Sequence, residues 1–122
     1  MEKKLDRRRK YYMVLDCETA TLPHAAVYES AAEKQRAAIA KPLIYDFGWN
    51  IVDIKGNVYR RRSFLITEIF SVPSIFNTAY YAWKRPIYLE RLAAGETTLT
   101  TWAEAVKVWE SDAKQVEAVG AF

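Results

Sequence analysis

The sequence of 122 residues contains a single cysteine, Cys17, and a single histidine, His24. One cysteine cannot form an internal disulfide. One cysteine and one histidine are also too few ligands for a structural zinc site, which needs four. There is also no glycine-rich phosphate loop, no internal repeat, and no apolar run near the roughly 20 residues of a membrane span. Because the basic start lacks the apolar stretch of a secretory signal, we expect a cytoplasmic protein without a membrane partner.

Charge is unevenly distributed over a chain whose composition is otherwise that of a small globular domain, with 51% hydrophobic residues and four tryptophans. We divide it into a basic tail, residues 1–10, and one folded domain, residues 11–122. The tail carries Lys3, Lys4, Arg7, Arg8, Arg9 and Lys10. Such a run attracts phosphate, although it is also typical of a solvated lead-in. A second cluster, Arg60 to Arg62, is divided between two faces if it lies on a strand.

The hydrophobic pattern of the first half predicts an antiparallel meander. Strands are predicted at residues 11–17, 43–54 and 58–69, with a glycine-containing hairpin turn at residues 53–57. Between the first two strands, residues 25–41 are rich in helix-forming residues and end at Pro42, which predicts a helix.

The second half predicts helices followed by a final strand. Residues 71–81 are expected to be irregular or a short helix, and Pro86 to Ala94 is bounded by proline and Gly95 as a short helix should be. Thr101 and Glu104 fit a capping box at the start of a helix from Trp102 to about Gln115, whose tryptophans we expect in the core. Val116 to Phe122 is predicted to be a last strand, parallel to the first.

Two carboxylates close the first strand, at Asp16 and Glu18. Strand side chains alternate, so both acids point to one face and Cys17 to the other. Paired carboxylates suit a hard divalent cation such as Mg²⁺ or Mn²⁺. Asp16 and Glu18 are therefore the candidate catalytic and metal-binding residues, and Asp46 and Asp53 are not assigned to the site.

The segment Asp16-Cys17-Glu18-Thr19 after an apolar strand resembles the first motif, D-x-E-T, of the DEDD or DnaQ-like 3'-5' exonucleases. The similarity continues through Pro42 to Val58 and the helix from Trp102. It ends at Val116 to Phe122, which is similar to the strand before the second motif of the family. The resemblance covers nearly the whole chain but corresponds to the amino-terminal half of a family domain.

The resemblance implies an α/β fold of the ribonuclease H type, here as a truncated mixed sheet of three antiparallel strands and a parallel fourth with helices packed on it. It also implies a two-metal nuclease site whose first two acids correspond to Asp16 and Glu18. The later acids and the general base of the family have no counterpart in the sequence. We therefore expect an incomplete site that binds Mg²⁺ or Mn²⁺ weakly. Single-stranded DNA or RNA would contact Thr19, Arg7, Arg8, Arg9 and Lys10.

Three functions remain open. The chain is interpreted first as a catalytically incomplete, exonuclease-like module that binds nucleic acid or a protein partner, of the kind a phage encodes. The alternatives are a metal-dependent 3'-5' exonuclease that is active as part of a longer enzyme, or one that two copies assemble by supplying two acids each. The last strand would then be the sheet edge through which a homodimer forms.

Overall fold

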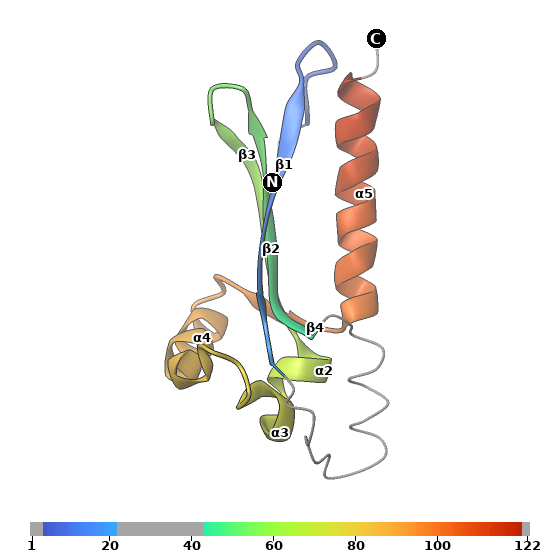
Figure 1. Cartoon of the computed structure of the whole chain (residues 1–122). Coiled ribbons are helices and arrows are strands. Elements are labelled where there is room, and N and C mark those ends of the chain that lie inside the picture. Colours follow the sequence, from blue (N-terminus) through green and yellow to red (C-terminus); the bar gives the residue numbers. More distant parts are fainter. Residues whose placement is uncertain (1–3, 22–42, 121–122) are drawn as a thin grey trace.

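The computed structural model describes residues 4–21 and 43–120 and shows a mixed α/β architecture built on one sheet (Figure 1). The strand order follows the sequence, with antiparallel pairing between the first three strands and parallel pairing between the last two. The strands are β1 (Tyr11–Thr19), β2 (Ile44–Asp53), β3 (Val58–Ile66) and β4 (Thr98–Thr100). The predicted antiparallel meander is confirmed, and a parallel fourth strand is present, although other residues form it than those predicted.

The helices occupy two places around this sheet. The long helix α5 runs along one face, whereas the short helices gather at the end of the sheet where β1 finishes (Figure 1). The helices are α2 (Thr67–Phe70), α3 (Pro73–Phe76), the 3₁₀ turn η1 (Ala82–Lys84), α4 (Arg85–Ala93) and α5 (Trp102–Gly120). No helix in the described ranges is long and apolar enough to cross a membrane.

Local sequence explains the turns and helix boundaries that were predicted. Gly56 has a φ of +85° in the β2–β3 hairpin and Gly95 a φ of +75° after α4, a region that favours glycine. The backbone N–H of Glu104 donates to the Thr101 hydroxyl over 3.2 Å. The Trp102 N–H donates to the buried Glu68 carboxylate, which adds a cap from α2 that the sequence pattern did not indicate.

The predicted last strand, Val116 to Phe122, is wrong, because α5 continues through Gly120. Val119 extends the helical apolar stripe and packs on Tyr11 and Ile51, so the helix gains burial by continuing. The parallel fourth strand is β4 instead. It pairs with β3 and lies at the opposite edge of the sheet from β1.

One further strand boundary differs from the prediction, and one predicted helix lies in a part of the chain that the structure does not describe. The third strand ends at Ile66, not Ile69, because Thr67–Phe70 turns into α2 and buries Ile69 and Phe70. The helix predicted at residues 25–41 and the loop residue His24 lie outside the described residues.

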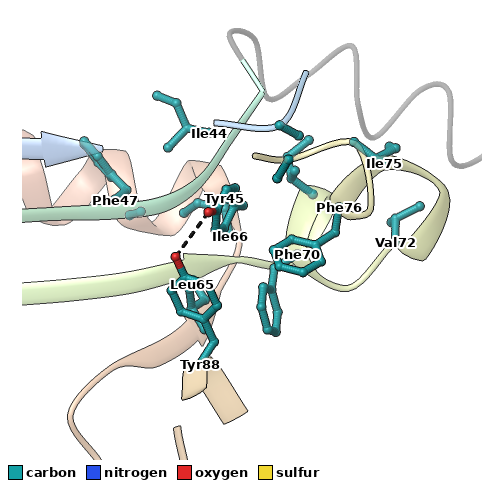
Figure 2. Close-up of a cluster of buried hydrophobic side chains, with 14 of the residues drawn as sticks. Ile44, Tyr45, Phe47, Leu65, Ile66, Phe70, Val72, Ile75, Phe76 and Tyr88 are labelled. Atoms are coloured by element: carbon teal, nitrogen blue, oxygen red, sulfur yellow. Dashed lines mark hydrogen bonds between the residues drawn. The ribbon is translucent and has the colours of Figure 1, made fainter. Parts of the chain in front are cut away.

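The main core lies where the sheet meets the short helices. Figure 2 shows side chains of β2 and β3 packed against those of α2, α3 and α4, with aromatic rings meeting edge to face. Tyr45 and Tyr88 share a hydrogen bond of 3.1 Å inside this cluster. The core extends under α5, where Trp109 packs on Trp49 with ring centroids 5.2 Å apart. Trp102 also packs against this core, so the predicted role of the two α5 tryptophans is confirmed.

A buried ion network fastens α5 to the sheet. Asp112 is fully buried and accepts hydrogen bonds from Trp49 Nε1 at 2.9 Å, Arg60 Nη1 at 2.8 Å and Arg62 Nε at 3.0 Å. Burial opposes ionisation of Asp112, but these donors hold its pKa below the usual value. Arg60 and Arg62 share one face, as strand alternation predicted, yet both turn toward this acid, and only Arg61 remains exposed on the other face.

We predict that Asp112→Ala lowers the free energy of unfolding by about 3–5 kcal/mol, because it leaves two guanidinium groups without their buried counter-charge. Urea unfolding followed by circular dichroism measures the loss. Lys107→Ala removes only an exposed ion pair with Glu104 on the same helix and should cost less than about 1 kcal/mol. Equal effects of the two substitutions would contradict the central role of the network.

Candidate functional site

The two acids of the D-x-E-T segment lie on the sheet face turned away from α5, here called the open face. Asp16 is paired with Gly48 on β2, and Glu18 with Asp46. Cross-strand partners in a sheet project to the same side. Three carboxylates, Asp16, Glu18 and Asp46, therefore share one end of the open face and form what we call the acidic site.

The sequence-based reading set Asp46 aside, and the structure places it beside Glu18. Burial raises the pKa of Asp46 to about 6, while Arg91 lowers it and the neighbouring Asp16 and Glu18 raise it further. The pKa of Asp46 therefore lies closer to neutral pH than that of a solvated carboxyl group. Only the register between β1 and β2 could have revealed this proximity, and the sequence between them does not fix that register.

A hollow of about 550 Å³ opens beside the acidic site. Its lining comes from three strands and from α4, and consists of Val14, Leu15, Asp16, Asp46, Gly48, Trp49, Asn50, Arg62, Ser63 and Arg91. Gly48 lines the hollow, and β3 approaches it so closely that a Cβ at this position would lie 2.9 Å from the Arg62 carbonyl oxygen. The position next to Asp16 thus has no side chain and leaves room for a ligand.

One cation faces the acids across this hollow. Arg91 of α4 donates from Nη2 to the Ser63 hydroxyl over 3.3 Å, and its Nε lies 3.9 Å from a Glu96 carboxylate oxygen. The Ser63 hydroxyl in turn donates to Thr97. The guanidinium is positioned by these contacts and lowers the pKa of Asp46 through its charge. An anion entering the hollow would therefore meet Arg91 as well as the acids.

Cys17 lies on the opposite side of β1 and packs against the core. Burial and then the charges of Asp16, Asp46 and Glu18 raise the pKa of its thiol. A raised pKa disfavours the thiolate, so Cys17 is a packing residue and not a nucleophile.

The donor set fits a divalent cation only in part. Asp16 and Glu18 supply carboxylate oxygens on one face, which Mg²⁺ and Mn²⁺ prefer. Within residues 4–21 and 43–120, however, no group of three or more acids, histidines or cysteines is arranged to hold a metal ion. A cation at this site would need further ligands from water or from a bound phosphate.

The predicted nucleic-acid contacts do not gather at the acidic site. Arg7, Arg8, Arg9 and Lys10 lie at the start of β1, at the other end of the strand from Asp16 and Glu18. Arg8 and Arg9 also form ion pairs with Asp6. Thr19 is exposed beyond a register shift that follows Glu18. The structure therefore separates a basic end of β1 from an acidic end.

Comparisons with models of known families, with curated proteins and with solved structures find no match to this chain. The site must therefore be interpreted from its own geometry.

The raised pKa of Asp46 makes stability depend on pH. A carboxyl whose folded pKa lies above its unfolded value stabilises the fold at low pH, and that contribution is lost as the pH rises from about 4 to about 6. We predict that Asp46→Asn is more stable than the wild type at about pH 7.5 by about 1–2 kcal/mol, allowing for partial solvent screening, with no difference near pH 4.

Urea unfolding across this pH range is the measurement. Glu110→Gln, on the exposed side of α5, shows what removal of a solvated carboxylate does by itself. A difference between Asp46→Asn and the wild type that stays constant over the whole range would contradict the assignment.

Proposed function

We propose that this chain is an exonuclease-like, single-strand nucleic-acid-binding protein of ribonuclease H-like ancestry, whose acidic site is incomplete for hydrolysis. The observation that carries the proposal is the placement of Asp16, Glu18 and Asp46 together on the open face, beside a hollow that also presents Arg91. Acids alone would repel a phosphate backbone. A site of this composition therefore binds nucleic acid with the help of a cation.

Asp16 and Glu18 are the residues that would hold this cation, with Asp46 next to them. When bound, Mg²⁺ or Mn²⁺ would neutralise the acids and attract phosphate oxygens. Arg91 supplies a second positive group for the same phosphate and is held in place through Ser63. Gly48 lines the same hollow without a side chain.

Binding without hydrolysis is proposed because carboxylates are the only general bases that the described residues place around the hollow. Its lining among the described residues contains no histidine, tyrosine or lysine. The nearby Tyr45 and Tyr88 are buried and bonded to each other, and burial raises the pKa of both hydroxyls. An attacking water would have no group poised to take its proton other than the acids themselves.

We predict that Mg²⁺ strengthens binding of a short single-stranded oligonucleotide to the wild type, and that the Asp16→Asn/Glu18→Gln variant loses this dependence. In EDTA the variant should bind about tenfold more tightly than the wild type, because two repulsive charges are gone. Fluorescence anisotropy with labelled DNA and RNA measures both effects, and gel lanes with Mn²⁺ show whether the strand is also cleaved.

The matched control is Glu104→Gln/Glu110→Gln, which removes two exposed charges from α5, away from the open face. It should leave the Mg²⁺ dependence unchanged. Mg²⁺ enhancement of equal size in the wild type and the Asp16→Asn/Glu18→Gln variant would contradict the proposal.

A second candidate function, a 3'-5' exonuclease assembled from two copies, is favoured by the position of β1. This strand lies at one edge of the described sheet, and Val14 and Leu15 are half exposed. Antiparallel pairing of two β1 strands about Cys17 would set Asp16 of one copy opposite Glu18 of the other. Four acids would then meet, and their repulsion would oppose pairing unless cations bind.

This candidate moves the predicted dimer edge from the last strand, which is helical, to β1. A Mn²⁺-dependent shift to the mass of a dimer, together with cleavage that Asp16→Ala abolishes, would favour it over the binding module. Cleavage only after addition of a further polypeptide would favour the remaining alternative, in which these acids belong to a longer exonuclease.

A further inference from the structure

A second hollow, of about 350 Å³, lies at the β2–β3 hairpin end of the sheet, and we call it the hairpin pocket. It is lined by the end of the basic tail, the first part of β1 and the hairpin turn. Its residues are Arg9, Lys10, Tyr12, Asp53, Ile54, Lys55 and Asn57. Arg9, Lys10 and Lys55 are cations, and Tyr12 and Ile54 offer apolar surface. The acidic site, in contrast, consists of three carboxylates.

The hairpin pocket is built around Asp53. The Asp53 carboxylate accepts hydrogen bonds from Lys55 N at 2.9 Å, from Asn57 N and Nδ2 at 3.0 Å, and from the Tyr59 hydroxyl at 2.9 Å. The hydrogen bonds of Asn57, followed by that of Tyr59, lower its pKa to about 2, so it stays ionised at neutral pH. The turn that carries Lys55 is thereby fixed.

The same network holds a cation at the rim. Arg9 donates from Nη1 to the Tyr59 hydroxyl over 3.0 Å, and Tyr59 is itself anchored on Asp53. The ring of Tyr59 also meets that of Tyr11 edge to face at 5.0 Å. Arg9 is therefore positioned by the fold, whereas the sequence pattern left open whether the tail contacts phosphate or is only a solvated lead-in. Pre-positioning lowers the entropic cost of binding an anion.

Apolar surface lies exposed next to these cations. Ile54 is 83% exposed and Tyr12 is 42% exposed. Lys10 Nζ lies 5.9 Å from the centroid of the Tyr12 ring. An exposed ring with cations around it is the usual platform for an unstacked base and its phosphate in single-strand binding. A duplex would keep its bases stacked and could not use the ring.

The position of Tyr12 relates the hairpin pocket to the acidic site. Tyr12 and Asp16 project to the same face of β1, four positions apart, which corresponds to about 13 Å along a strand. A single strand held at Tyr12 can therefore run along the open face toward Asp16 and Glu18. The exposed Arg61 projects from β3 to the same face, opposite Asn50 of β2.

We propose that the hairpin pocket binds one nucleotide unit of a single-stranded nucleic acid, with the base against Tyr12 and Ile54 and the phosphate among Arg9, Lys10 and Lys55. This inference rests on the proposed function. It adds to that function the residues that bind the nucleic-acid strand at a second place, distant from the acidic site. In this proposal, Tyr12 contacts the base, and Lys55, Arg9 and Lys10 contact the phosphate as lining residues of the hairpin pocket.

Fluorescence anisotropy with a labelled oligothymidylate, and with an oligouridylate of equal length, tests the pocket. Tyr12→Leu should weaken binding about tenfold, as expected for loss of one stacked base, whereas Tyr12→Phe should bind like the wild type. Lys55→Gln should reduce the slope of log affinity against log salt by about 0.7, the value for one phosphate contact on a single strand. Thermal melts by circular dichroism confirm that each variant is folded.

Two variants serve as matched controls. Tyr80→Leu removes a tyrosine that is 82% exposed outside the pocket, and Lys107→Gln removes an exposed lysine from α5. Both should bind like the wild type. Displacement of the oligonucleotide by a polyglutamate peptide of equal charge would overturn the proposal, because the pocket would then be a general polyanion site.

The outcomes separate the pocket from the proposed function. If the wild type binds with Mg²⁺ dependence but Tyr12→Leu and Lys55→Gln are without effect, the pocket assignment is overturned and the proposed function stands. If the pocket variants weaken binding while the Asp16→Asn/Glu18→Gln variant behaves as the wild type, the pocket is supported and the role of the acidic site fails. No binding by the wild type at low salt overturns both.

Discussion

The buried carboxylate of Asp112 is the contact on which the arrangement of this protein depends. It accepts hydrogen bonds from Trp49 of β2 and from Arg60 and Arg62 of β3, and these bonds connect α5 to the middle of the sheet. α5 covers that face, and no other long helix of residues 4–21 and 43–120 runs along the opposite face of these strands (Figure 1). Two of the three consecutive arginines are used for folding, and the surface available to a ligand is determined by what β1 and β2 present on the opposite side.

On that opposite side, charge is arranged along β1. The exposed ring of Tyr12 lies at the hairpin end, next to the hairpin pocket and its cations, and carboxylates lie at the other end beside the hollow that Gly48 lines. A polyanion would be attracted at one end and would need a cation at the other. In the single-strand binding function that we propose, the acidic site and the basic tail, which lie apart in the sequence, would contact the same strand.

Local patterns predicted much of the fold but not the site. Alternation on β1 correctly placed Asp16 and Glu18 on one face and Cys17 on the other, and Gly56 and Gly95 marked real turns. Asp46 was missed because its place beside Glu18 depends on strand register. Val116 to Phe122 was misread because a short apolar run is compatible with either a strand or a helix end, and packing of Val119 on Tyr11 and Ile51 decides between them.

The most direct test of the central claim is a residue-resolved nitrogen-15 NMR titration of the protein with a single-stranded oligonucleotide and Mg²⁺, followed by trace Mn²⁺. The account predicts shift changes at Tyr12, Lys55, Gly48 and Ser63, Mn²⁺ broadening around Asp16, Glu18 and Asp46, and an unchanged outer side of α5. Changes confined to α5, or broadening that avoids the three acids, would contradict it.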